Sequence, residues 1–592
     1  MIDTLAKIRS LLTAAERRAA VVLFGLMLIG MVLETLGVGL VVPVIALILQ
    51  GDLLALHPAL VVHLGSLGSM SQRELIVVAM LGLVGAYFLK NAFLAFLIGK
   101  QTHFAYNVQE KLSQRLFTIY LRQPYTFHLQ RNSAELVRNI TGEVGILTGV
   151  LTSGLLMLTE LLVTAGVACL LLLVEPVGAL LAVLVFCGSA WVFNRLTRER
   201  ITRWGIERQI HDGLRLQHLQ QGLGGAKDVK LLGRESEFLA QFQTHNAKST
   251  RIWRLLATLQ SYPRLMFEML AVCGLAVLVL SMLAQQRDLS SIVPTLGLFA
   301  AAAFRLMPSV NRILTAVQNL RYTLPVVASL HRESQLPAPD LKAAAVTNRS
   351  PFSDVLTISE LVYQYPGASR LALDGVSISI RRGESVGLIG ASGSGKSTLV
   401  DVILGLLEPV AGVVKVDGDD IQQWLRYWQD QIGYVPQTIY LTDDTLRRNV
   451  AFGLRDDEID EAAVQRAIES AQLDSFIDTL PEGLDTIVGE RGVRLSGGQR
   501  QRIGIARALY HDPAVLVMDE ATSALDTATE SGVMQAVSAL HGCKTIVIVA
   551  HRLSTVEKCD RLIRLEQGKV VEDGPPSSIL ARITGLPDHL SH

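Results

Sequence analysis

Residues 390–398 read Gly-Ala-Ser-Gly-Ser-Gly-Lys-Ser-Thr, a glycine-rich loop that ends in a lysine and two hydroxyls. Glycines let backbone N–H groups turn toward phosphate oxygens, a lysine reaches the β- and γ-phosphates, and the next hydroxyl binds Mg²⁺. An apolar run at 385–389 predicts a buried strand before the loop, and residues 399–404 predict a helix after it. We therefore expect a phosphate-binding loop formed by Gly390, Ala391, Ser392, Gly393, Ser394, Gly395, Lys396, Ser397 and Thr398.

Two further apolar runs end in groups that act on phosphates. Residues 515–518 lead into Asp519 and Glu520. Here Asp519 is expected to hold Mg²⁺ through water, and Glu520 to polarise the attacking water. Residues 545–550 lead into His551, which can donate to the γ-phosphate; a histidine packed in the core is the alternative. This pattern predicts nucleotide hydrolysis.

Three other features fit the same site. The predicted strand at 432–436 ends in the amide of Gln437. Tyr365, upstream of the loop, can stack on adenine or pack in the core. A serine and two glycines at a helix N-terminus form a second anion site. Its members are Ser496, Gly497, Gly498 and Gln499.

The composition predicts a membrane domain ahead of these motifs. Half of the 592 residues are hydrophobic and 18% are charged, which is typical of a chain with membrane spans and more than one domain. The net charge is zero, so no bulk attraction to nucleic acid is expected. Six apolar segments are long enough to cross a bilayer. They lie near 20–49, 75–98, 145–174, 177–194, 265–285 and 289–311.

The connections between these segments give an orientation. Residues 99–144 and 195–255 are rich in Lys and Arg, so the positive-inside rule places them in the cytoplasm. Turns near 124–130 and 222–230 interrupt long predicted helices and are expected to contact a soluble domain; a solvated helical hairpin is the alternative. After the first span, leucines at spacings of three and four predict an amphipathic helix. This helix is expected to lie in the outer membrane–water interface; packing over the ends of other helices is the alternative. The leucines form one stripe, which consists of Leu53, Leu56, Leu60, Leu64 and Leu67.

Charged residues inside the spans are costly and are usually paired or functional. They are Glu34, Lys90, Glu160, Arg264, Glu268 and Arg305. At ~1.5 Å per residue, the cations Lys90, Arg264 and Arg305 lie toward the cytoplasmic leaflet, where they can meet an anionic head group. Pairing of Arg264 with Glu268 and snorkelling to the inner interface are the alternatives.

The predicted organisation is therefore a membrane domain over 1–325, a linker over 326–352 and a nucleotide-binding domain over 353–592. The linker carries the stretch Leu-Pro-Ala-Pro-Asp at 336–340. We expect a six-helix membrane domain fused to an α/β P-loop ATPase domain with a helical subdomain.

The whole chain resembles the exporters of the ATP-binding cassette family, with one membrane domain and one cassette. The resemblance identifies residues 495–499 as the signature, residues 523–526, which end at Asp526, as the D-loop, and His551 as the switch. It also gives Gln437 a role in catalysis and as a Mg²⁺ ligand. It implies ATP and Mg²⁺ as cofactors, a homodimer with two shared sites, and a bacterial inner-membrane location with the cassette in the cytoplasm.

The substrate is inferred from a second resemblance. Residues 259–268 and 303–312 are similar to the bacterial lipid-linked oligosaccharide flippases. This implies ATP-driven flipping of an anionic lipid-linked saccharide, with Lys90, Arg264 and Arg305 contacting its pyrophosphate; Lys90 stands where those flippases have arginine. Export of lipid A-like lipids or amphipathic drugs is the alternative, and an ATP-gated channel or regulator is the alternative of a different class.

Overall fold

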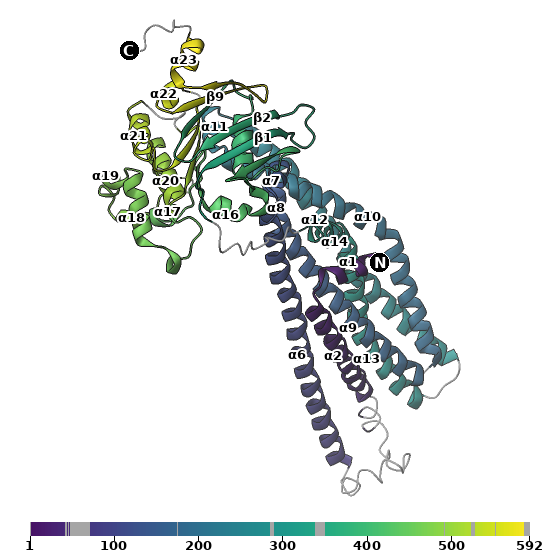
Figure 1. Cartoon of the computed structure of the whole chain (residues 1–592). Coiled ribbons are helices and arrows are strands. Elements are labelled where there is room, and N and C mark those ends of the chain that lie inside the picture. The colour runs from purple at the N-terminus through teal and green to yellow at the C-terminus, as the bar shows by residue number, and fades with distance from the viewer. Residues whose placement is uncertain are drawn as a thin grey trace. The chain divides into compact units, whose positions relative to one another are not determined.

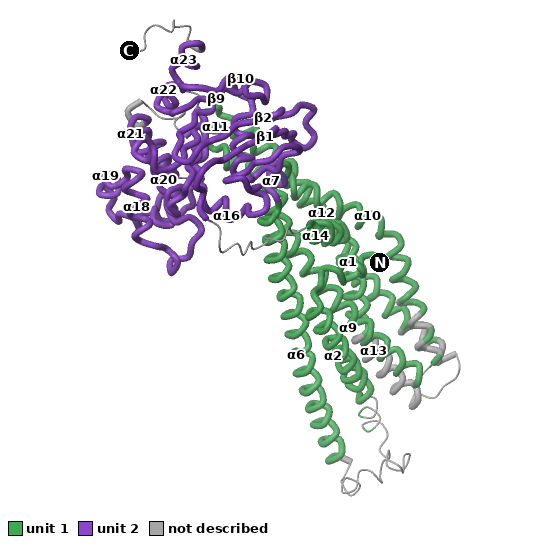
Figure 2. Tube along the Cα trace, viewed as in Figure 1, with its two compact units in different colours: residues 1–123, 130–338 green, residues 124–129, 339–592 purple. Residues whose placement is uncertain are grey.

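The computed structural model describes residues 2–41, 44, 47, 72–174, 176–284, 289–337, 350–489, 492–521, 527–550 and 552–584. The chain divides into two compact units (Figure 2). Unit 1 comprises Met1–Gln123 and Gln130–Ala338, and unit 2 comprises Pro124–Leu129 and Pro339–His592. The short segment Pro124–Leu129, predicted to contact a soluble domain, thus clusters with the unit that carries the phosphate loop.

Unit 1 is helical throughout its described residues, and its long helices run alongside one another (Figure 1). Three of them, α6, α10 and α12, have 49 or 50 residues and measure ~75 Å, so they extend well beyond a hydrocarbon layer of ~30 Å. The long helices are α2 (Ala14–Gly39), α6 (Gln72–Leu121), α9 (Val144–Val174), α10 (Pro176–Gly224), α12 (Glu235–Ala284) and α13 (Leu289–Tyr322). The short elements are α1 (Ile2–Leu11), α7 (Tyr125–Gln130), α8 (Ser133–Arg138), the π-helix η2 (Asn139–Glu143), α11 (Ala226–Leu231) and α14 (Leu324–Ser334).

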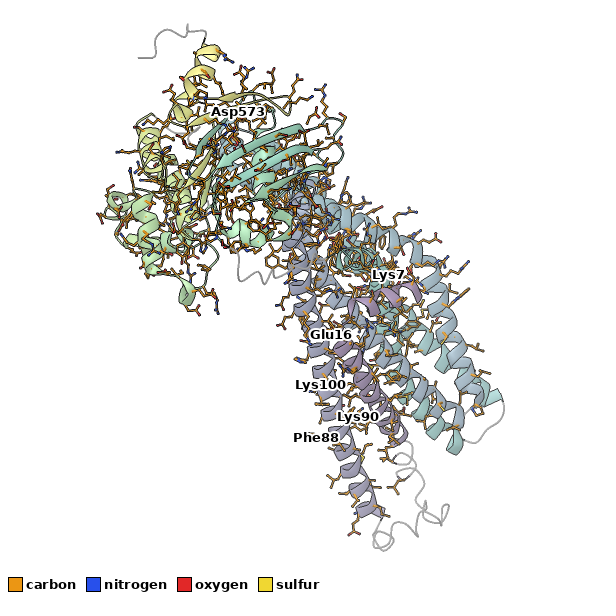
Figure 3. All side chains as sticks on the ribbon, viewed as in Figure 1. Lys7, Glu16, Phe88, Lys90, Lys100 and Asp573 are labelled. Atoms are coloured by element: carbon orange, nitrogen blue, oxygen red, sulfur yellow. The ribbon has the colours of Figure 1, made fainter. Side chains whose placement is uncertain are left out.

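Length and apolar composition mark three stretches of the described residues as able to cross a membrane. They are Ala14–Gly39, Arg73–Leu121 and Ser133–Leu173. Large apolar side chains stay exposed on these helices; Phe88 on α6, for example, is 77% exposed (Figure 3). A surface of this kind suits contact with lipid rather than water.

The core of unit 1 forms where α9 packs against α2, α6 and α13. Val163 and Val167 of α9 are fully enclosed there, with Val38 of α2. The stripe Leu53 to Leu67 lies outside the described residues, so the outer helix predicted from it stays a prediction.

Helix α14 occupies the first part of the stretch predicted to be the linker. Val326, Val327 and Leu330 are buried against Leu11 and Leu116 of unit 1. Their spacing puts them on one helical face, a short apolar period within a mostly polar stretch. Residues 338–349 are outside the described part of the chain.

Unit 2 contains two sheets. The smaller one is antiparallel in the order β2-β1-β4-β5, and the larger one has the order β10-β9-β3-β8-β7-β6. In the larger sheet β9, β3, β8, β7 and β6 are parallel, and β10 pairs antiparallel with β9. The strands are β1 (Val355–Tyr363), β2 (Leu373–Arg381), β3 (Ser385–Ile389), β4 (Ala411–Val416), β5 (Asp419–Asp420), β6 (Ile432–Val435), β7 (Val515–Asp519), β8 (Thr545–Val549), β9 (Arg561–Glu566) and β10 (Lys569–Gly574).

Helices complete unit 2 in two groups. One core gathers β1–β4 around Trp428, whose indole N–H donates to the Ile403 carbonyl at 2.7 Å. The other core joins β6 and β7 to a helical group that includes α20. The helices are α15 (Lys396–Ile403), α16 (Leu425–Asp430), α17 (Leu446–Val450), α18 (Glu461–Ser470), α19 (Asp474–Ile477), α20 (Gly497–Leu509), α21 (Thr527–Ser538), α22 (Leu553–Val556) and α23 (Pro576–Thr584), with 3-10 turns η3 (Ile421–Gln423), η4 (Asp456–Glu458) and η5 (Gly483–Asp485). The predicted α/β ATPase fold with a helical subdomain is confirmed.

Within unit 1, α10 approaches the end of α13 closely at Gly205. A Cβ at this position would lie 2.1 Å from the Tyr322 carbonyl oxygen. Three residues further along α10, the buried Arg208 guanidinium lies 5.4 Å from the Tyr322 ring centre and pairs with Asp212 at 3.1 Å. The close approach of α10 to the end of α13 therefore requires glycine at position 205, because any side chain there would meet the Tyr322 carbonyl.

We predict that Gly205→Ala destabilises the protein by about 1–3 kcal/mol, because the methyl group would press on a backbone atom that cannot rotate away. The measurement is the melting temperature of the purified full-length protein. Gly188→Ala on the same helix is the matched control, since a Cβ there meets nothing within 4 Å. It is expected to be neutral or to gain up to about 1 kcal/mol of helix propensity. Equal melting temperatures for the two variants would contradict the packing argument.

Candidate nucleotide site

The loop after β3 has the backbone conformation that phosphate binding requires. Gly390 and Gly395 have φ of 147° and 105°, which L side chains rarely adopt. A Cβ would lie 2.2 Å from the Leu565 carbonyl oxygen at the first position and 2.6 Å from that of Ala372 at the second. Glycine is required at both, because conformation and space exclude any side chain.

Lys396 begins α15 and folds back over its own loop. Its Nζ lies 2.9 Å from the Gly390 carbonyl oxygen and 3.0 Å from that of Ala391, and the residue is only 4% exposed. Burial lowers the pKa of Lys396, while the Glu520 and Asp519 carboxylates act in the opposite direction. The ammonium is thus already directed into the loop that would hold the phosphates.

The sheet brings the predicted carboxylates to the same edge as this loop. Parallel strands end at one edge, and β8 lies between β3 and β7. Asp519 is in register with Val549 of β8, and the Glu520 N–H donates to the Val549 carbonyl at 3.0 Å. Glu520 has φ of 49°, an uncommon conformation that a fixed backbone must maintain.

Gln437, two residues after the end of β6, reaches the Glu520 carboxylate. Its Nε2 donates to Glu520 Oε2 at 2.7 Å. The structure thus joins the amide predicted at the end of one strand to the carboxylate predicted at the end of another, 83 residues away. An amide held on this carboxylate can orient it toward a water molecule.

The donor set fits Mg²⁺, which prefers hard oxygen ligands. Ser397 supplies an exposed hydroxyl in the first turn of α15, Asp519 a carboxylate and Gln437 an amide. Burial raises the pKa of the nearby Asp401 carboxyl to about 6, and the negative charge of Asp519 acts in the same direction. Asp401 is a residue that our sequence reasoning missed, although a carboxyl group within the apolar run 399–404 was a detectable signal.

Tyr365 lies beside the loop. Its hydroxyl is 3.2 Å from Thr398 Oγ1, and its ring meets Tyr363 edge-on with centres 5.1 Å apart. Burial raises the pKa of Tyr125 in the Pro124–Leu129 segment, and Asp401 and Tyr365 raise it further. Stacking of Tyr365 on adenine stays a prediction, for which its half-buried ring is suitably placed.

The second predicted anion site begins α20. Ser496 is exposed and forms a capping box: its Oγ accepts from the Gln499 N–H at 3.2 Å, and Gln499 Oε1 accepts from the Ser496 N–H at 2.8 Å. At the other end of α20, the Ala508 carbonyl packs against Gly433 of β6, three strands away from β3. Gly497 and Gly498 therefore stand on an element anchored at the edge strand β6, three strands away from the strand that leads into the phosphate loop. Asp526 and His551 lie outside the described residues.

The three predicted substrate cations have different surroundings in unit 1. Lys90 lies on α6 (Figure 3). It is enclosed: its Nζ lies 3.4 Å from Glu34 Oε2 and 4.2 Å from the Tyr87 ring centre. Arg264 is exposed on α12, as is Glu268. The side chain of Arg305 is outside the described part of the structure. Contact of these residues with a substrate stays a prediction.

Two family models match the chain. The model described as ABC transporter matches residues 373–523, and the one described as ABC transporter transmembrane region matches residues 26–304. Together they cover both units, in the order expected for an exporter. This chain belongs to the ABC transporter family. It is a multi-pass membrane half-transporter whose ATPase domain is coupled to transport.

Similar proteins share most of this transporter's length. A protein named ATP-dependent lipid A-core flippase from Ralstonia nicotianae is 32% identical over 479 residues, 80% of each chain. One of the same name from Dechloromonas aromatica is 33% identical over 80% of this chain and 81% of its own. The ABC transporter ATP-binding protein YknV of Bacillus subtilis is 32% identical over 86% and 84%. The solved structure of a bacterial Atm1-family ABC exporter with ATP bound superimposes with a TM-score of 0.77 over 97% of both chains, at 24% identity.

These comparisons support the exporter assignment, and the flippases among them bear the name of the alternative substrate, lipid A, rather than that of the first one. The membrane-domain motifs predict kinship with the lipid-linked oligosaccharide flippase PglK, whereas the named flippases reported above are lipid A-core flippases.

We predict that Glu520→Gln keeps ATP binding but lowers the rate of hydrolysis about 10²–10⁴-fold, because an amide cannot take the proton of the attacking water. Lys396→Ala should instead weaken ATP binding about ten- to hundredfold, since one charged hydrogen-bond donor is lost. Hydrolysis and nucleotide binding are measured on the purified transporter. Glu557→Gln, an exposed carboxylate elsewhere in unit 2, is the control. Near-normal hydrolysis by Glu520→Gln would overturn the role given to this carboxylate.

Proposed function

We propose that this transporter works as a homodimer in the bacterial inner membrane and uses ATP hydrolysis to flip a phosphorylated, lipid A-like lipid. The observation that supports this choice of substrate is the similarity to proteins named lipid A-core flippases, at 32–33% identity over four fifths of each chain. Lipid A carries phosphate, and cations within the spans suit such a head group.

The hydrolytic part of the proposal rests on the residues gathered at the sheet edge. Loop amides and Lys396 hold the phosphates, and the Ser397 hydroxyl, Asp519 and Gln437 hold Mg²⁺, which neutralises charge on the phosphates when bound. Glu520, oriented by Gln437, takes a proton from the attacking water. His551 is proposed to donate to the γ-phosphate, and Asp526 to belong to the loop between the two sites.

The homodimer follows from the separation of the two anion sites. The signature residues 496–499 stand on α20, which is anchored on β6, while the phosphate loop follows β3. A second copy facing the first can bring its signature to this loop. Every motif is present in one chain, so two identical chains suffice for two complete sites.

A second candidate substrate is a lipid-linked oligosaccharide. The motifs at 259–268 and 303–312 favour it, because they place Arg264 and Arg305 in the spans. The pairing of Lys90 with Glu34 weakens it, since that cation is already neutralised. A channel or regulator needs no complete hydrolytic set, so the Gln437–Glu520 contact argues against that class.

We predict that vesicles containing the purified protein flip lipid A upon addition of ATP, and that Glu520→Gln vesicles do not. A polyprenyl-pyrophosphate saccharide and a neutral glycolipid are tested in parallel, with ATPase activity measured on the same preparation. Flipping of the polyprenyl lipid alone would favour the second candidate. Failure to flip any of the three, with active ATPase, would overturn the proposal.

A further inference from the structure

A second charged pair lies deep in unit 1, between α9 and α13. The Arg312 Nη1 atom donates to Glu160 Oε1 at 2.5 Å, and the Ser309 hydroxyl donates to Glu160 Oε2 at 2.6 Å. Glu160 is only 3% exposed. A buried carboxylate is costly unless it is paired and hydrogen-bonded, and both oxygens here have donors.

The polar contact between α9 and α13 continues toward the cytoplasm. Two turns away on each helix, Asn319 Nδ2 lies 3.5 Å from Ser153 Oγ, and Gln260 Nε2 of α12 donates to Asn319 Oδ1 at 2.7 Å. Ser153 and Glu160 are seven residues apart, as are Arg312 and Asn319, so each pair lies on one face of its helix. We call these four residues, together with Ser309 and Gln260, the polar seam.

Two ion pairs among the described residues of the spans differ in accessibility. In the Lys90–Glu34 pair the side chains are 11% and 8% exposed, so both charges are enclosed. In the Arg312–Glu160 pair the arginine side chain is 48% exposed and the glutamate 3%. The carboxylate thus fixes one edge of the guanidinium while much of that side chain remains accessible.

The position of Arg312 along α13 suits a lipid head group. It lies 23 residues after Leu289, or ~35 Å along the helix, and the hydrocarbon layer is ~30 Å thick. With the orientation predicted from the charged connections, Arg312 lies toward the cytoplasmic leaflet, while its partner Glu160 lies ~21 Å along α9 from the outer end of that helix. A guanidinium carries five donors in a planar fork, which matches the oxygens of a phosphate.

We infer that Arg312, held in place by Glu160 and Ser309, binds the phosphate of the transported lipid at the Glu160 end of the polar seam. The inference rests on the proposed function and names the residue that recognises the phosphate. Glu160 is a positioning residue in this account: it orients the guanidinium and does not itself touch the lipid.

The test separates phosphate recognition from a purely structural ion pair. The double variant Glu160→Gln/Arg312→Gln removes both charges of this pair together, so neither of the two is left without the other. The full-length protein in phosphatidylcholine nanodiscs is titrated with lipid A and with a dephosphorylated lipid A, and the half-maximal concentration for ATPase stimulation is measured. Lys100→Gln, an exposed lysine on α6, is the matched control (Figure 3). Melting temperatures verify folding.

We expect the double variant to raise the half-maximal concentration for lipid A about tenfold or more and to leave that for the dephosphorylated lipid unchanged, because one charged hydrogen-bond partner is lost. Lys100→Gln should respond as wild type does. A folded double variant that still prefers the phosphorylated lipid would overturn the inference. If the double variant does not fold, Arg312→Lys is measured in its place. This variant keeps the positive charge but loses the planar fork of donors that matches a phosphate. An unchanged preference for the phosphorylated lipid in this variant would also overturn the inference.

The outcome for the wild-type protein distinguishes this inference from the proposed function. If both lipids are flipped and stimulate the ATPase equally, the proposed flipping stands and phosphate recognition by Arg312 is wrong. If neither lipid is flipped or stimulates the ATPase, the proposed function fails and the inference fails with it.

Discussion

The ATPase chemistry depends on the register of four parallel strands. With β8 between β3 and β7, and β6 beside β7, the strand ends deliver Lys396, Glu520 and Gln437 to one edge of the sheet. A slip of one residue in β7 would turn the Asp519 side chain to the other face of the sheet, because side chains alternate along a strand. The buried apolar residues of β3, β7 and β8 fix that register, since all or nearly all of each of these three strands is enclosed.

Two buried carboxylates of unit 1 are neutralised by cations that differ in their accessibility. Lys90 and Glu34 neutralise each other inside the bundle and stabilise the contact between α2 and α6. Glu160 and Arg312 also neutralise each other, but the arginine remains accessible. The first arrangement is sufficient to hold two helices together, whereas the second also leaves a cation that an anionic lipid can reach.

The sequence was most informative where function is carried by consecutive residues. The strand, loop and helix around Lys396, and the carboxylates at the end of β7, could be predicted because each motif is local and has its own chemistry. The membrane unit was predicted from apolar length alone. Contacts between distant segments could not be predicted: Glu34 and Lys90 are 56 residues apart, and Glu160 and Arg312 are 152 apart. The pKa of Asp401 likewise depends on burial and on Asp519, which only the folded sheet brings near.

The central claim is that each ATP is hydrolysed between the phosphate loop of one chain and the signature of another. It is tested by comparing two purified mixed dimers that carry the same pair of substitutions. In the first, one chain carries Lys396→Ala and the other Ser496→Ala; in the second, one chain carries both and the other is wild type. Shared sites predict that the first dimer keeps one intact site and hydrolyses ATP, whereas the second has none and is inactive. The opposite result, activity only in the dimer with one wild-type chain, would mean that each chain holds a complete site and would contradict the account.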